Sequence, residues 1–232
     1  MNQKRIAALA LMSALAASVT PAMAANPTVN VTIKWNTQSL SSLTVTSNYT
    51  NTGAMGASAG TIFANLNGGA GICSAAAGSN VAQTVDFGNV TPDAVKYTDC
   101  NFNNGANAQY STNDSLGYSL TVQETTAATH DANKLLCYLP NGSQTAASPV
   151  VSTRTSNALT PSIIAVTQTD ATCSAAVAGA VAIKAASAST ITSAAAATAG
   201  VQNAGGDIEL VLQPNAPSGA DQTTATWTLV LN

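Results

Sequence analysis

Residues 207–232, DIELVLQPNAPSGADQTTATWTLVLN, contain two runs in which apolar and polar side chains alternate. A period of two places successive side chains on opposite faces of a β-strand, so each run predicts a strand with one apolar face. The Pro, Asn and Gly residues at 213–219 predict a turn between them. The stretch therefore predicts two antiparallel strands of a half-buried sheet. Their apolar faces would be formed by Ile208, Leu210, Leu212, Ala225, Trp227, Leu229 and Leu231.

Other segments carry strand signals of different strength. The strongest are residues 28–35 and 116–123, another β-rich run lies at 40–49, and shorter runs occur at 61–66, 85–90, 95–97, 135–139, 150–153 and 163–164. The Asn-rich residues 101–113 predict a long loop, and residues 194–197 could form one helical turn. Because no 3.6-residue apolar period is sustained after residue 24, long helices are not expected. The patterns predict an all-β protein, an antiparallel β-sandwich of jelly-roll or immunoglobulin-like type with little helix.

The beginning of the chain has the features of a secretory signal peptide. Lys4 and Arg5 precede an apolar run, and Ala22-Met23-Ala24 provides a small-x-small cleavage site. The apolar run is about 12 residues long, where a membrane span needs roughly 20. We therefore expect residues 1–24 to be removed and residues 25–232 to form a single secreted β-sandwich, with an Ala/Ser/Thr-rich insertion near 171–199. The expected location is extracellular or at the cell surface, without a membrane span in the mature chain.

Charge is sparse and slightly acidic. Of the 7 basic residues of the chain, Lys4 and Arg5 belong to the signal peptide, which leaves 5 basic residues against 10 acidic ones, a net charge of −5. Such a balance disfavours nucleic acid and anionic membranes as partners. The expected partners are an envelope polymer, a surface protein or other copies of the chain.

The 4 cysteines all lie in the mature part of the chain. An even number of cysteines in an exported protein predicts two disulfides, for which three pairings are possible. We prefer Cys73 with Cys100 and Cys137 with Cys173, because sequential pairing closes modest loops across neighbouring strands. A zinc site is not expected, since no cysteine pair has CxxC spacing and His130 is the only histidine.

Catalytic signatures are missing from the sequence. No Gly-x-Ser-x-Gly elbow occurs, and His130 stands in a polar segment without a recognisable partner. We therefore expect no enzymatic activity, no cofactor and no metal. Four acids with asparagines near them could supply oxygen ligands to calcium, but the spacing of an EF-hand is absent, and we interpret them as solvated acids of turns. These residues are Asp86, Asp93, Asp99 and Asp114, with Asn101, Asn103 and Asn113.

Two segments, 115–122 and 226–229, resemble the two Trp-x-Leu motifs of WxL-type bacterial surface domains, and 85–88 resembles the strand that opens such domains. The resemblance covers residues 85–232. Tyr118 stands at the position of the first Trp, and the cysteines and the Ala-rich stretch are not part of the pattern. The resemblance implies a non-enzymatic role in attachment to, or organisation of, the cell surface. Its motif residues are Tyr118, Leu120, Trp227 and Leu229.

The strand predicted at residues 28–35 begins close to the expected cleavage site. In this respect the chain resembles subunits of extracellular filaments, which polymerise by donating a strand to a neighbouring copy. The donated face would consist of Val29, Val31, Ile33 and Trp35. The alternative is that this strand pairs within its own domain. The sequence thus predicts a WxL-like surface module, with a self-assembling filament or pilus subunit as the second hypothesis.

Overall fold

A computed structural model describes residues 40–47, 49, 62–63, 72–73, 84–128, 131–155, 157–159 and 169–232. The chain divides into two units, 1–38 and 39–232, and every described residue belongs to the second unit. The expected signal peptide, the predicted strand at 28–35, His130 and the predicted strand at 163–164 lie outside the described residues. Among the helices of the described part, none is long and apolar enough to span a membrane.

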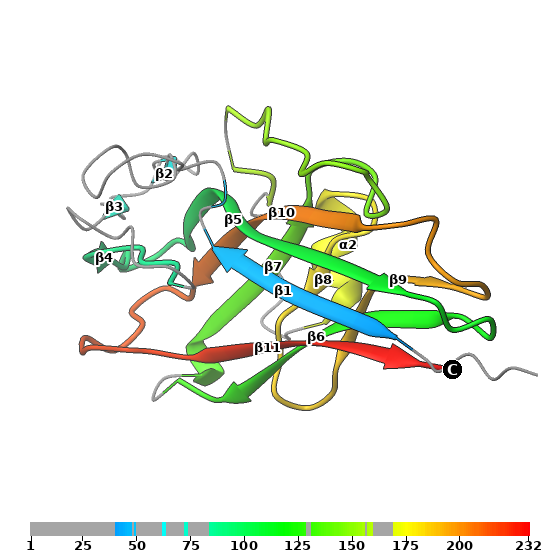
Figure 1. The fold of residues 1–232 in the computed structure, drawn as a ribbon. Helices are drawn as coiled ribbons and strands as arrows, with labels where there is room; N and C mark the ends of the chain where they lie inside the picture. The colour runs from blue at the N-terminus through cyan, green and yellow to red at the C-terminus, as the bar shows by residue number, and fades with distance from the viewer. Residues whose placement is uncertain are drawn as a thin grey trace, which may run out of the picture. The chain divides into compact units, whose positions relative to one another are not determined.

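Two antiparallel sheets make up the main body of this unit (Figure 1). The larger sheet has the order β1-β5-β10-β7-β8, with β2 paired to β5, and the smaller has the order β11-β6-β9. The prediction of an all-β antiparallel sandwich with little helix is confirmed. The larger sheet contains β1 (Ser41–Ser47), β2 (Ile62–Phe63), β5 (Thr98–Thr112), β7 (Lys134–Pro140), β8 (Val181–Ala182) and β10 (Gln202–Leu212). The other elements are β3 (Ile72–Cys73), β4 (Val90–Thr91), β6 (Tyr118–Thr126), β9 (Ser189–Ala194), β11 (Thr224–Leu231), the 3-10 turn η1 (Asp131–Asn133) and the helix α2 (Asp170–Ala176).

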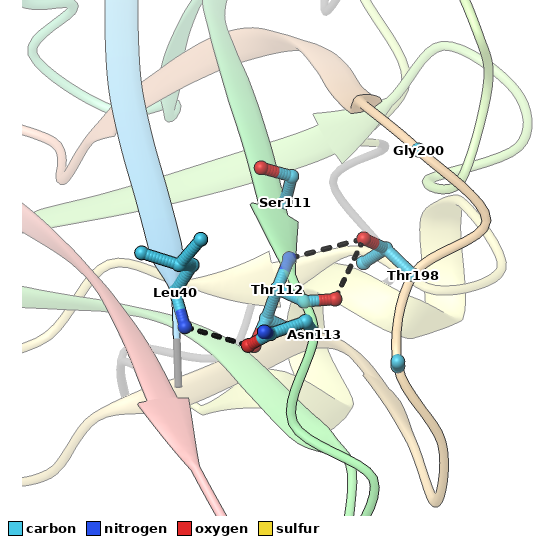
Figure 2. A pocket seen from close by; sticks show the side chains of 7 residues that line it. Leu40, Ser111, Thr112, Asn113, Thr198 and Gly200 are labelled. Atoms are coloured by element: carbon cyan, nitrogen blue, oxygen red, sulfur yellow. Dashed lines mark hydrogen bonds between the residues drawn. The ribbon is translucent and has the colours of Figure 1, made fainter. Parts of the chain in front are cut away.

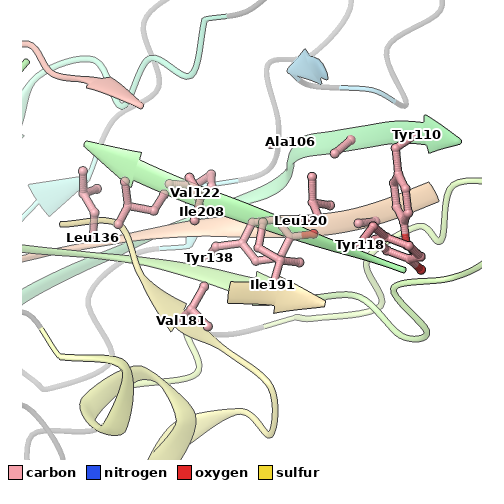
Figure 3. Close-up of a cluster of buried hydrophobic side chains, with 13 residues drawn as sticks. Ala106, Tyr110, Tyr118, Leu120, Val122, Leu136, Tyr138, Val181, Ile191 and Ile208 are labelled. Atoms are coloured by element: carbon pink, nitrogen blue, oxygen red, sulfur yellow. The ribbon is translucent and has the colours of Figure 1, made fainter. Parts of the chain in front are cut away.

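The main apolar core lies between the two sheets (Figure 3). On β6, Tyr118, Leu120 and Val122 point inward, as their alternation predicts, and all three are buried. The rings of Tyr110 and Tyr118 meet with their centroids 5.3 Å apart. Fully burying one such large side chain stabilises the fold by roughly 2–3 kcal/mol, so this layer is the main source of stability of the sandwich.

A second apolar cluster covers the opposite face of the larger sheet, which we call the outer face. It contains Leu135, Cys137 and Leu139 of β7 together with Cys173 of α2. The helix begins after Thr169, whose side-chain oxygen accepts a hydrogen bond from the backbone N–H of Thr172. Residues 171–199 therefore provide α2, β8 and β9, and they contribute buried side chains to both clusters.

Two disulfides join the pairs that sequence reasoning preferred. Cys73 of β3 is linked to Cys100 of β5, and Cys137 of β7 is linked to Cys173 of α2, with Cα–Cα distances of 5.8 and 5.7 Å. The four described cysteines are thus all paired. A disulfide of this span restricts the unfolded chain and typically contributes about 3–4 kcal/mol.

The two strands of residues 207–232 are not partners of each other, which corrects the predicted hairpin. Strand β10 pairs with β5 and β7 in the larger sheet, whereas β11 pairs with β6 in the smaller one. Residues 213–223 cross from one sheet to the other. Alternation shows that one face of a strand is buried, but it does not show which sheet the strand joins. A hairpin and two strands in different sheets therefore have the same sequence pattern.

The predicted loop at 101–113 is wrong, because these residues form most of β5, the longest strand. Their asparagines are buried and hydrogen-bonded, which a loop assignment does not anticipate. Asn104 has φ +56° and lies opposite a register shift of β10 between Gly206 and Ile208, so the strand bends there. At Gly105 a Cβ would lie 2.5 Å from Ile208 Cγ1, which explains a glycine inside a strand.

Several smaller assignments also need correction. Residues 150–153, 95–97 and 194–197 form neither the predicted strands nor the predicted helical turn, except that Ala194 ends β9. Of residues 85–90, only Val90 is in a strand. The acids Asp93 and Asp99 are buried, at 5% and 1% exposure, and are therefore not solvated acids of turns.

Candidate interaction surface

In the described part of the chain, each of the two sheets ends in an edge strand on the same side of the sandwich, β1 in the larger sheet and β11 in the smaller. Within the described residues, β1 pairs only with β5 and β11 pairs only with β6. The two edge strands contact each other, and in Figure 1 β1 (blue) and β11 (red) come close near the end of the chain marked C. An open edge presents main-chain N–H and C=O groups that another strand can bind.

The apolar side chains of these edge strands are only half-buried. Along β11, side chains alternate strictly between half-buried and exposed. The half-buried ones pack against the main core, as do Leu43 and Val45 of β1. Apolar surface that faces a core but remains partly in water is what an added strand can cover. We call this set the β1–β11 edge: Leu43, Val45, Ala225, Trp227, Leu229 and Leu231.

The residues of the WxL-like motifs lie on neighbouring strands. In the register of β6 and β11, Leu120 is opposite Leu229, Tyr118 is opposite Leu231, and Trp227 is opposite Val122. Tyr118 and Leu120 are buried, at 2% and 0% exposure, and Trp227 is half-buried on the same inward face. The prediction that Trp227 and Leu229 face the interior is confirmed. The motif side chains therefore build the core and the β1–β11 edge.

Trp227 is expected to stabilise the fold through its ring. Trp227→Ala should lower the free energy of unfolding by about 2–4 kcal/mol, somewhat less than for a fully buried Trp, because the side chain is half-buried. Trp227→Phe is the matched control. It keeps most of the packing and removes an indole N–H that is buried without a hydrogen-bond partner, so we expect less than about 1 kcal/mol of change. Urea denaturation measures both, and equal losses would contradict this account.

The other face of the smaller sheet is polar. Thr226 and Thr228 of β11 are exposed, and Thr121 and Gln123 of β6 lie opposite them. The Thr125 and Thr226 hydroxyls are 3.0 Å apart. On the described residues of β6 and β11 this face therefore offers hydroxyl and amide groups, together with the exposed side chain of Val230.

A small pocket of about 320 Å³ lies where β1 begins and β5 ends (Figure 2). Thr198 Oγ1 accepts from the backbone N–H of Thr112 at 3.0 Å and donates to its carbonyl at 3.1 Å. The Asn113 side chain accepts from the backbone N–H of Leu40 at 2.6 Å. These polar groups are thus used within the protein, and the lining contains no acid, base or thiol that could catalyse a reaction.

Sequence reasoning missed a row of buried polar side chains on the outer face of β5 and β10, which we call the polar row. A segment at 141–159, described except for residue 156, crosses this row and hydrogen-bonds to it. The segment pairs with β10 through its backbone at one bridge, Ala146↔Asn203, and by the hydrogen bond from Asn141 N–H to the Gly205 carbonyl. Polar side chains of the sheet bind other backbone groups of the segment, such as the carbonyl of Arg154 and the N–H of Leu159. The polar row consists of Asp99, Asn101, Asn103, Asn107, Asn203, Asp207 and Glu209, all at most 8% exposed.

Asp207 forms the best-satisfied part of the polar row. Its carboxylate accepts hydrogen bonds from Arg154 Nη1 and Ser152 Oγ at 2.8 and 2.7 Å. It also accepts from Asn141 Nδ2 and from the backbone N–H of Asn104, at 2.9 and 2.8 Å. The Asp207 side chain is fully buried, and that of Arg154 is 19% exposed. A buried charge with this many partners fixes residues 141–154 on the sheet.

Asp99 and Glu209 form a second, less satisfied part. Their carboxyl groups lie within hydrogen-bonding reach of each other. The pKa of Asp99 is raised to about 10, mainly by burial and next by the charge of Glu209. Burial also raises the pKa of Glu209. Glu209 accepts from the backbone N–H groups of Ala158 and Leu159, whereas both oxygens of Asp99 have no partner as a carboxylate. Two carboxylates can bond only through a shared proton.

Comparisons with protein-family models, with characterised proteins and with solved structures find no match to this chain.

Proposed function

We propose that the protein is an exported, non-enzymatic structural component of the cell surface whose copies join by strand addition. The observation that supports this most is the β1–β11 edge, where two strands in contact with each other have open edges within the described residues and carry half-buried apolar side chains. The proposed occupant is the segment 28–35 of another copy. Two intrachain disulfides fit an oxidising, extracellular location.

Length and pattern support this occupant. Segment 28–35 has as many residues as β11, which spans 8. Its alternation offers Val29, Val31, Ile33 and Trp35 on one face, which would cover the apolar side chains of the β1–β11 edge. Burial of this face would contribute on the order of 6–12 kcal/mol before the cost of ordering. Main-chain hydrogen bonds would pair the open strand edge.

Removal of the strand or a charge on its apolar face tests the proposal. We expect the parent protein to form assemblies, and expect both a deletion of residues 25–36 and Val31→Asp to leave folded monomers. An unpaired carboxylate in an apolar interface is severely unfavourable. Asn30→Asp adds the same charge to the opposite face of the segment and should still assemble. Sedimentation and electron microscopy measure assembly, and circular dichroism measures folding.

Two results would contradict strand addition. The first is a parent protein that stays monomeric at every concentration. The second is a Val31→Asp monomer that has lost its cooperative melt while Asn30→Asp retains it, because this shows that the segment pairs within its own domain.

Attachment to an envelope polymer or surface protein, the role implied by the WxL resemblance, is the second candidate function. The observation that favours it is the side-by-side arrangement of the two motif strands, which presents one polar face with Thr121, Gln123, Thr226 and Thr228. Hydroxyl and amide groups are suited to hydrogen-bonding a polysaccharide. Monomers that sediment with isolated envelopes, and lose this binding in a Thr226→Val/Thr228→Val variant of unchanged stability, would favour this role over self-assembly.

A further inference from the structure

The Asp99 end of the polar row contains buried oxygen atoms that lack hydrogen-bond donors. The described residues contain seven buried side-chain N or O atoms without a partner, and four of them belong to three residues: Asp99 Oδ1 and Oδ2, Asn101 Oδ1 and Asn157 Oδ1. Asp99 and Asn101 are 1% and 0% exposed. Oxygen atoms buried in this way are costly unless something supplies positive charge or a proton.

These oxygens come from neighbouring residues of two strands and the segment that crosses them. Asp99 and Asn101 occupy the same face of β5, and Asn101 lies directly opposite Glu209 in the register with β10. Asn157 Nδ2 donates to the backbone carbonyl of Asp99 at 2.7 Å. Asn101 Nδ2 donates to Asn103 Oδ1 at 2.6 Å, so the amide group uses its donor there and leaves its oxygen without a partner.

The positive charge available nearby is already committed. Arg154 binds Asp207 and Asn141 with one guanidinium nitrogen and the carbonyl of Pro140 with another. The charge of Arg154 lowers the pKa of Glu209 less than the hydrogen bonds that Glu209 makes. A single proton shared by Asp99 and Glu209 would leave the second Asp99 oxygen and both amide oxygens without a donor. A cation held among these oxygens would supply the positive charge that they lack.

We propose that Asp99, Glu209, Asn101 and Asn157 form a Ca²⁺ site that fastens the 141–159 segment to the larger sheet. Carboxylate and amide oxygens are the ligands that Ca²⁺ prefers, and its coordination geometry is flexible, whereas Mg²⁺ requires near-octahedral geometry and keeps several waters. No group of three His, Cys, Asp or Glu side chains suitable for a metal occurs in the described part of the chain. Two carboxylates supplemented by amides are consistent with affinities of about 0.1–1 mM, as in extracellular Ca²⁺-binding modules.

Ca²⁺ added to the chelator-treated, oxidised protein tests the site. At pH 7.5 we expect 10 mM CaCl₂ to raise the melting temperature by about 3–8 °C and titration calorimetry to detect saturable binding. MgCl₂ at the same concentration should produce a smaller shift. Asp99→Asn should fold, because its amide can donate to Glu209 as a protonated Asp99 would, and it should lose the Ca²⁺ response. Asn157→Ala should weaken the response, because it removes one oxygen at the edge of the site.

Asp221→Asn is the matched control, since it makes the same charge change at an exposed position and should keep the full Ca²⁺ response. Absence of both a thermal shift and a binding heat at 10 mM CaCl₂ would overturn the proposal. An equal shift in the parent and in Asp99→Asn would also overturn it, because the ion would then bind elsewhere.

Discussion

Asp207→Ala is expected to lower the free energy of unfolding by about 3–5 kcal/mol, the cost of removing one partner of a buried ion pair. The substitution leaves the Arg154 guanidinium without its carboxylate, and it leaves the donors of Asn104, Asn141 and Ser152 without an acceptor. Urea denaturation at pH 7 measures the loss. Asp221→Ala changes an exposed acid and should stay within about 0.5 kcal/mol of the parent.

The double variant Asp207→Leu/Arg154→Met separates the ion pair from its individual charges. Replacing both charges with apolar side chains of similar size should cost less than Asp207→Ala alone, because no unpaired charge remains. A loss below 1 kcal/mol for Asp207→Ala would show that the 141–159 segment contributes little to stability. Additive losses in the cycle formed by Asp207→Leu, Arg154→Met and the double variant would show that the pair does not act as a unit.

Stability in the absence of Ca²⁺ is expected to fall as pH rises, with Asp99 as the main cause. The pKa of Asp99 is raised to about 10 in the folded protein by burial and by Glu209, from an ordinary value of 3.8. Between these values the folded state binds a proton that the unfolded state does not, so the free energy of unfolding decreases with pH. The slope should approach about 1.4 kcal/mol per pH unit, or roughly 4 kcal/mol over three units.

Urea midpoints in chelator at pH 5.5, 7 and 8.5 measure this dependence. Asp99→Asn carries no titrating group at this position, so its stability should be nearly constant across the range and should exceed that of the parent at pH 8.5. A parent protein whose stability is constant or increases over the same range would contradict the buried Asp99–Glu209 pair.

Apolar alternation predicted the strands that face the main core. Tyr118, Leu120 and Val122 of β6 alternate with polar residues and are buried as expected, and β11 follows the same rule. Such a pattern arises wherever one face of a strand packs on a core and the other meets water. The fold class and the inward orientation of the Trp227 side chain could therefore be predicted from the sequence.

The polar row could not be predicted in the same way, because both faces of β5 are covered by protein. Its inner face carries Phe102, Ala106, Ala108 and Tyr110, and its outer face carries asparagines that meet the 141–159 segment. Asn is common in loops because its side chain bonds to nearby backbone, and only a distant segment makes it suitable for a buried strand. The one sequence signal that this segment forms a strand was the alternation of Ala106, Ala108 and Tyr110 with polar residues.

The position of β1 at the edge of the larger sheet has a mechanical consequence for the proposed linked copies. In the proposed assembly only a few residues separate the donated segment 28–35 from β1, so tension along a chain of copies would pull on the beginning of β1. Strand β1 pairs with β5 through seven consecutive residue pairs, from Ser41↔Thr112 to Ser47↔Ala106. Pulling along this ladder loads its hydrogen bonds in shear, so that they must fail together rather than one after another. The same seven-residue strand that leaves an edge open would thus transmit force into the centre of the larger sheet.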